Sequence, residues 1–239
     1  MRKDSCMENN IKRTLPPVIG RIFRELSGKG PERQYVFMAG NVIAVRVYGY
    51  VQGAFYDGKL LEDGMMCSAM RTYYQKMLRN SIDVIRGALQ VSSDYNVMDM
   101  LCDFHIKNNN GVIFLVLDRY VEDDNAIHGA ELQFIQHHVR TFFKKHTGGI
   151  PKLVNAYFCD NCLLICAEQF LGSFTETPFM NDAEMIEANK IFYLKMIQHA
   201  METHIGDYST DKVTYTDVFC DVNIYSDSCY IFLKGEPAQ

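Results

Sequence analysis

The sequence contains no run of about 18 apolar residues, so it predicts no transmembrane helix. Its first residues, MRKDSCMENNIKRT, are polar and lack the apolar segment of a secretory signal. No glycine-rich phosphate loop, Gly-x-Ser-x-Gly elbow or His-Glu-x-x-His motif occurs. We therefore expect a soluble intracellular protein that has no contact with membranes and is not an enzyme.

The cysteines and histidines give no complete set of metal ligands. Cys159 and Cys162 form a Cys-x-x-Cys pair, but a structural zinc site commonly needs two such pairs, and the other cysteines do not supply the second. His199 and His204 fall on one predicted helix, but they are five positions apart and so do not share a helix face. We expect reduced, mostly buried thiols, and neither a metal nor any other cofactor.

Charge is distributed unevenly along the chain. The total is −5, of which residues 1–148 contribute +3 and residues 149–239 contribute −8. The modest basic excess of the first part permits nucleic-acid binding, and the acidic second part disfavours it. Different partners are therefore expected for the two parts of the chain.

Alternating apolar and polar residues predict β-strands in the stretch Tyr35–Tyr74. A long first strand is expected over Val42–Gln52, where Gly49 and Gly53 allow the sharp bend that a small barrel requires. A short second strand should follow, and Met66–Tyr74 should form the third. This pattern is typical of the OB-fold, a five-stranded barrel.

The next segment completes the predicted barrel. Ile82–Val91 alternates and should be a fourth strand, and Leu101–Ile106 pairs with Gly111–Tyr120 as a hairpin with an Asn-Gly turn. A helix over 125–146 follows, with an apolar stripe of spacing three and four. We predict a flexible arm over 1–16 and an OB-fold domain with a C-terminal helix over 17–148.

Residues 149–239 predict a smaller module of helix and strand. Asn181–Ile205 has the caps and apolar stripe of a helix, and Val213–Val222 and Asn223–Leu233 alternate as two strands. These elements are compatible with an α+β or winged-helix interaction module.

Four segments resemble one branch of OB-folds, which contains the middle subunit of replication protein A and the small OB subunit of the CST telomere-capping complex. They are IGRIFREL, YVFMAGNVIAVRVYGYV, the Leu61–Gly64 turn and the strand Ile82–Leu89. Glu62 and Met65 depart from the Asp-Asp-Gly-Thr turn of that branch. Within it, the abundance of Met, Cys and Tyr suggests an insect telomere-capping subunit. The resemblance implies a nuclear location at chromosome ends.

The expected function is single-stranded DNA binding in a replication or telomere complex, by aromatic residues that stack on bases and cations that contact phosphates. The predicted nucleic-acid-binding residues are Arg46, Tyr48, Tyr50, Phe55, Tyr56, Arg71, Tyr73, Lys76, Arg86 and Lys107. The alternative is an adaptor that binds only proteins.

The resemblance also implies that the helix over 125–146 pairs with another OB-fold or telomere-capping subunit, although packing within the chain is an open alternative. Its apolar stripe consists of Leu132, Ile135, Val139, Phe142 and Phe143.

Overall fold

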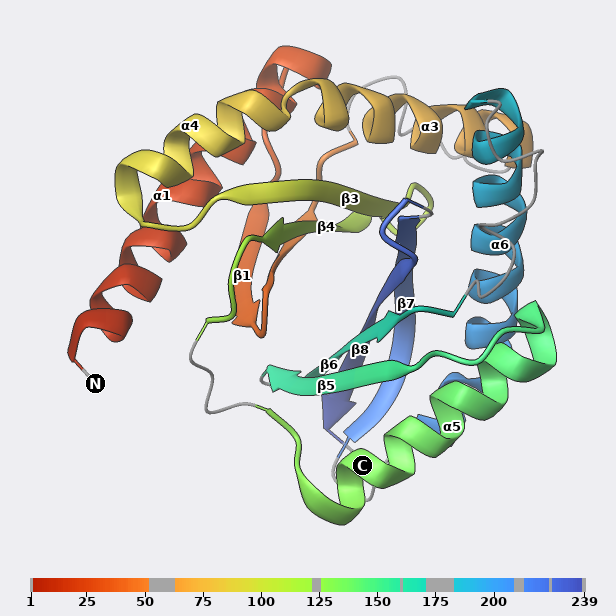
Figure 1. Ribbon diagram of the computed structural model, residues 1–239. Coiled ribbons are helices and arrows are strands. Elements are labelled where there is room, and N and C mark those ends of the chain that lie inside the picture. Colours follow the sequence, from red (N-terminus) through yellow and green to blue (C-terminus); the bar gives the residue numbers. More distant parts are fainter. Residues whose placement is uncertain are drawn as a thin grey trace. The chain divides into compact units, whose positions relative to one another are not determined.

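A computed structural model describes residues 2–51, 63–121, 126–159, 161–170, 183–208, 213–223 and 225–237 (Figure 1). The chain divides into two compact units, Met1–Asp123 and Asp124–Gln239. The helix that was predicted to end the first domain therefore belongs to the second unit.

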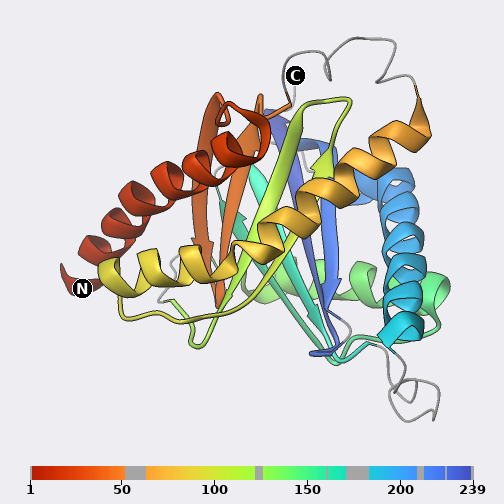
Figure 2. The same ribbon diagram turned by 90° about the horizontal axis from the view of Figure 1, so that it is seen from above.

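The first unit is a four-stranded antiparallel sheet with helices on one face (Figure 2). The sheet order is β1-β2-β4-β3, and the described part of the connection between the two hairpins contains the helices α3 and α4. The elements are α1 (Arg2–Ser27), β1 (Arg33–Ala39), β2 (Val42–Tyr48), α3 (Gly64–Asn80), α4 (Ile82–Ser92), β3 (Val97–His105) and β4 (Asn110–Leu117).

The core of the first unit lies between this sheet and its helices. Ile43, Val45 and Val47 alternate along β2, so all three project to the helical side, where Phe23 of α1 and Leu78 of α3 are fully buried against them. Strand alternation and helix spacing thus supply the two halves of one core.

Two predicted strands of the barrel are helices. Tyr74 and Leu78 are the buried residues of α3, and Ile85 and Leu89 are those of α4, in each case four positions apart, as one helix face requires. The side chain of Asp63 caps α3 by accepting a hydrogen bond from the Met65 amide at 2.8 Å. The prediction of strands over Met66–Tyr74 and Ile82–Val91 was wrong, because a short segment with few buried residues fits the strand period as well as the helix period.

The predicted N-terminal arm is also helical. Residues 2–16 belong to α1, which continues through Pro16 and Pro17. Prolines disfavour a helix interior because they cannot donate the backbone hydrogen bond. Here Leu15 and Ile19 are buried on either side of the prolines, so core packing of the helix outweighs that cost.

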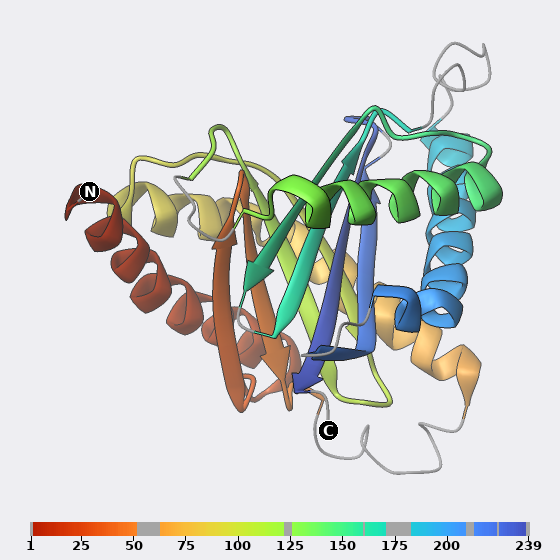
Figure 3. The ribbon, with the colours of Figure 1, turned by 90° about the horizontal axis from the view of Figure 1, so that it is seen from below.

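The second unit is another four-stranded antiparallel sheet with helices on one face, and Figure 3 shows α5 crossing that face. The sheet order is β5-β6-β8-β7. The elements are α5 (Gly129–Thr147), β5 (Leu153–Cys159), β6 (Cys162–Glu168), α6 (Ala183–His204), the 3-10 turn η4 (Ile205–Tyr208), β7 (Val213–Asn223) and β8 (Ser228–Pro237).

The prediction of a mainly β fold is confirmed at that level. In the described ranges the strands make two four-stranded antiparallel sheets, not the closed five-stranded barrel of an OB-fold. The second unit combines helix and sheet, and its strands Val213–Asn223 and Ser228–Pro237 pair as a hairpin, whereas the last strand was predicted over Asn223–Leu233.

The two units repeat one topology: a helix, a hairpin, a helical connection and a second hairpin, with the same sheet order. The repeat extends to sequence. Cys102-Asp103 in β3 corresponds to Cys220-Asp221 in β7, and both aspartates are fully buried. Ile113-Phe114-Leu115 in β4 recurs as Ile231-Phe232-Leu233 in β8, at the same spacing.

Unusual backbone positions repeat as well. Gly49 and Gln169, which follow β2 and β6, both have a positive φ. Each donates its amide to a turn residue with a positive φ: Gly49 to the Asn109 oxygen at 2.9 Å, and Gln169 to the Asp227 oxygen at 2.7 Å. In both units, the residue that follows the second strand is therefore hydrogen-bonded to the turn of the second hairpin, and both positions have a left-handed backbone.

Candidate functional site: a histidine-lined cavity

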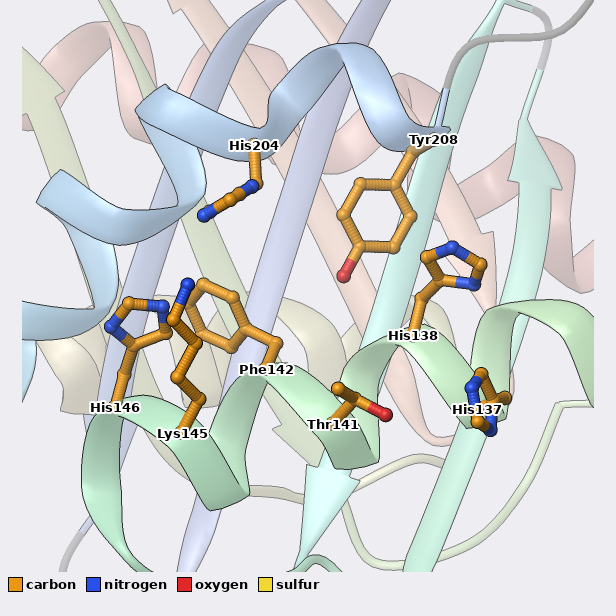
Figure 4. A pocket seen from close by; sticks show the side chains of 8 residues that line it. All are labelled: His137, His138, Thr141, Phe142, Lys145, His146, His204 and Tyr208. Atoms are coloured by element: carbon orange, nitrogen blue, oxygen red, sulfur yellow. The ribbon is translucent and has the colours of Figure 1, made fainter.

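A cavity of about 220 Å³ lies between α5 and the end of α6 with η4, entirely within the second unit (Figure 4). Its lining side chains are His137, His138, Thr141, Phe142, Lys145, His146, His204 and Tyr208. Four of the seven histidines of the chain thus meet in one place.

The helix α5 is held by its buried stripe, and this sets which residues face the cavity. Val139 and Phe143 are fully or almost fully buried in the core of the second unit. His138, Phe142 and His146 follow one another at intervals of four, so they share the neighbouring helix face and point toward α6.

His146 and His204 form one end of the cavity, with ring centroids 5.9 Å apart. The Nε2 atom of His146 is buried and has no hydrogen-bond partner in the described part of the chain. Burial lowers the pKa of His146 below its ordinary value, and the neighbouring Lys145, His204 and His199 lower it further. His146 is therefore held mainly uncharged at neutral pH.

The other end of the cavity is formed by His138 and Tyr208, whose rings lie 6.2 Å apart. His138 is oriented by its own helix: Nδ1 lies 3.0 Å from the Phe134 carbonyl oxygen, and its ring lies 4.1 Å from that of Phe134. Because a carbonyl oxygen only accepts, Nδ1 carries the proton and Nε2 is left to act as an acceptor while the ring is neutral.

The lining can bind a ligand through hydrogen bonds and positive charge. It contains an ammonium group, imidazoles and two hydroxyls, and neither a carboxylate nor a thiol is among the lining residues. Among the described residues no cluster of three or more His, Cys, Asp or Glu side chains is arranged to hold a metal ion. The chemistry of the cavity is that of a donor-rich pocket.

The residues predicted to bind nucleic acid lie on several elements of the first unit. Tyr50 is fully buried among the aromatic rings of the core, and its hydroxyl donates to the Asn110 carbonyl at 3.3 Å. It has no exposed face on which a base could stack. Arg46 is 5% exposed, and its guanidinium lies 4.4 Å from the ring centroid of the half-buried Tyr48.

Two predicted phosphate-binding cations make structural contacts. Arg71 of α3 forms an ion pair with the fully buried Asp103 at 2.6 Å. Arg86 of α4 donates to the carbonyl oxygens of Val97 and Met98 and pairs with Asp83. Arg71 thus links α3 to β3, and Arg86 links α4 to β3 and also contacts its own helix. These contacts explain both arginines without a nucleic acid.

The remaining predicted residues are dispersed. Tyr73 and Lys76 are exposed on α3, and Lys107 is exposed in the turn between β3 and β4. Phe55 and Tyr56 lie outside the described residues. The described residues that were predicted to bind nucleic acid thus lie on one strand, on two helices, in one turn and in the core, and not on one face of a barrel.

The stripe predicted to bind a partner subunit packs within the second unit. Ile135, Val139, Phe142 and Phe143 are buried in its core, and the partly buried Leu132 packs against them. This is the alternative of packing within the chain.

The cavity itself was not predicted from the sequence. The spacing of His199 and His204 speaks only to two ligands on one helix, whereas His204 lies beside His146 of a different helix and lines one cavity with it. The available signal was the histidine-rich face of α5 at intervals of four beside its apolar stripe. The pairing of α5 with α6 is a tertiary contact that this signal does not contain.

Comparison with protein families matches residues 7–119 to a family described as "Na+-translocating membrane potential-generating system (MpsC)". The matched segment lies within the first unit. Searches of curated proteins and of solved structures gave no match. In the described ranges, no helix combines the length and the apolar character needed to cross a bilayer.

This match overturns the predicted identity and function. The segment thought to resemble replication protein A and CST subunits matches the MpsC family, and two of its supposed strands are helices. Four predictions were therefore wrong: membership of an insect telomere-capping complex, single-stranded DNA binding as the function, the alternative of an OB-fold adaptor, and a location at chromosome ends. The described residues have neither the barrel nor the strand order on which those predictions depended.

Proposed function

We propose that this chain is a non-catalytic, ligand-binding subunit of a Na+-translocating, membrane-potential-generating system. The observation that carries the proposal is the family match over residues 7–119, because these residues coincide with a compact unit that has its own core. A match to a whole folding unit is better support than a match to a scattered motif.

The repeat extends the proposal to the second unit. Because this unit has the same element order and the same sheet order, we regard it as a second module of the same type, arranged in tandem with the first. Its cavity supports a role in ligand binding, since the lining supplies hydrogen-bond donors and small clefts are where proteins bind small molecules.

The direct test is to delete the gene for this chain in cells that carry it and to prepare inverted membrane vesicles. Na+-dependent membrane potential would be measured with a potential-sensitive dye, and Na+ movement with ²²Na+. We expect the Na+-dependent signal to be lost on deletion and restored when the purified full-length chain is added back.

Two controls make the result specific. A K+-dependent potential imposed with valinomycin should be equal in both kinds of vesicle, which excludes leakiness as the cause. The Phe23→Ala variant, which opens a cavity in the core of the first unit, should restore the signal poorly. An unchanged Na+-dependent potential after deletion would refute the proposal.

A further inference from the structure

The repeat allows the histidine-lined cavity to be compared with the same place in the first unit. Both N-terminal helices end in the same way: Ser27 and Thr147 donate a hydroxyl hydrogen bond to the carbonyls of Phe23 and Phe143, at 2.9 and 2.8 Å. The glycines that follow both have a positive φ, of 82° and 76°. These shared ends set the register between α1 and α5.

In this register the two helices differ at the positions that line the cavity in the second unit. Val18, Ile22 and Leu26 of α1 are replaced in α5 by His138, Phe142 and His146. In the first unit Ile22 belongs to the core, Val18 and Leu26 pack against it, and α1 contacts α4. At these positions the first unit therefore has apolar side chains that join its core.

The second unit has histidines at two of these three positions. Burying an imidazole nitrogen without a hydrogen-bond partner is unfavourable, and the Nε2 atom of His146 is in this situation. Sequences usually depart from good local packing where a site has a function. The histidines are thus better explained by a ligand than by the needs of the fold.

The charges around the cavity indicate the class of ligand. The chain has a net charge of −5, yet the described residues that line the cavity include Lys145 and four histidines, and none of them is acidic. Lys145 takes part in no ion pair within the part of the chain that the structure describes. A pocket with one lysine ammonium, several imidazoles and hydroxyls and no described acid, in an acidic protein, is complementary to an anion.

We propose that the cavity binds a small oxyanion of the phosphate class, either inorganic phosphate or the head of a phosphomonoester, through Lys145, His146 and His204. The volume of about 220 Å³ suits such a ligand, because pockets for larger organic molecules are typically about 300–1,000 Å³. The inference stands on the second unit alone and does not depend on the proposed role in Na+ translocation.

Binding is coupled to proton uptake. Among the described residues, the titratable groups that shift the pKa of His146 are Lys145 on its own helix and His204 and His199 on α6, and none of these three is an acid. Without a ligand, these neighbours and burial oppose protonation of His146. An oxyanion between the same groups favours the imidazolium form, so affinity rises as pH falls from 8 to 6.

The test is calorimetric titration of the full chain with inorganic phosphate at pH 6 and pH 8, at constant ionic strength set with chloride. We expect dissociation constants of about 1 mM or tighter at pH 6, and affinity at least about five-fold weaker at pH 8. The NMR signal of the His146 ring should titrate at higher pH when phosphate is bound. Glycerol 3-phosphate serves as the phosphomonoester arm, and tighter binding of one of the two ligands identifies the source.

Two exposed lysines offer a matched pair of variants, because Lys144 adjoins Lys145 on α5 but does not line the cavity. Lys145→Met and His204→Gln should each weaken phosphate binding by about ten-fold or more, as loss of a charge-assisted hydrogen bond does. Lys144→Met should bind as the parent does. Circular dichroism of each variant confirms that it is folded.

Three results would overturn the proposal. The first is no phosphate binding up to about 20 mM at pH 6, far above the affinity of about 1 mM that the site should provide. The second is an equal loss of affinity in Lys144→Met and Lys145→Met, which would indicate general surface attraction. The third is binding of Zn²+ that depends on His146 and His204 in a protein that ignores phosphate, which would make the cavity a metal site.

Discussion

In the first unit α1 contacts α4 and carries the buried Ile22 with the partly buried Val18 and Leu26. The second unit has His138, Phe142 and His146 at the corresponding positions of α5, where they line the cavity beside α6. The residues one face away are alike in the two helices: Leu15, Ile19 and Phe23 correspond to Ile135, Val139 and Phe143, all buried. The buried face of the helix, which we call its anchor, is therefore apolar in both units. The neighbouring face, which we call the seam, differs between them. One framework can therefore carry an apolar contact in one unit and a donor-rich cavity in the other.

The largest expected effects test whether the two anchors are equivalent. Phe23→Ala and Phe143→Ala each remove a fully buried ring, so each should lower the free energy of unfolding of its unit by about 3–5 kcal/mol. Urea unfolding followed by circular dichroism measures the loss. Phe134→Ala, at a position on α5 that is 51% exposed, serves as the control and should have little effect. A small loss in only one of the two core variants would show that the anchors are not equivalent.

The next effect concerns a buried charge in the first unit. Arg71→Met removes the guanidinium that lies 2.6 Å from the carboxylate of the fully buried Asp103. Losing one member of a buried ion pair costs about 3 kcal/mol, because the remaining charge stays in a poorly solvated position. Urea unfolding should show this loss, and Lys76→Met on the exposed side of the same helix should not. If the double variant Arg71→Met/Asp103→Leu is no more stable than Arg71→Met, the buried charge is not the cause.

The smallest expected effect comes from replacing a histidine of the second unit by the residue type found at the same position of the first. His146→Leu introduces the residue type found at Leu26 and removes the unpartnered Nε2 atom, so it should stabilise the second unit by about 1 kcal/mol at pH 8. The pKa of His146 is lower in the folded state than its ordinary value of about 6.5, so the unfolded state binds more protons between the two values. The free energy of unfolding of the parent is therefore not reduced by this group above that range, and it falls as pH decreases through the range.

Thermal unfolding across pH 5–8 measures this linkage, at pH values chosen to span the ordinary histidine pKa. His146→Leu should be less sensitive to acid than the parent. His137→Leu, which changes an exposed histidine of the same helix, should retain the sensitivity of the parent. Equal acid sensitivity in the parent and in His146→Leu would show that His146 is not the responsible group.

Elements with strong local patterns were predicted correctly. The hairpin of β3 and β4 was expected near its observed position because an Asn-Gly turn separates two apolar runs. The helices α5 and α6 were expected because their apolar residues keep a spacing of three and four over several turns. In contrast, α3 and α4 carry few buried residues each, and these short patterns were assigned to strands under the assumption of a barrel.

The sequence by itself determined the hairpin of β3 and β4, the helices α5 and α6 and the uneven distribution of charge, because turn residues and periodicity act over a few neighbouring positions. It also contained the repeat, in the recurrence of Cys-Asp and Ile-Phe-Leu. Only the tertiary structure decided the sheet order and the meeting of His146 with His204, which lie on different helices. Contacts between distant segments depend on how whole elements pack, and that information is not local to either segment.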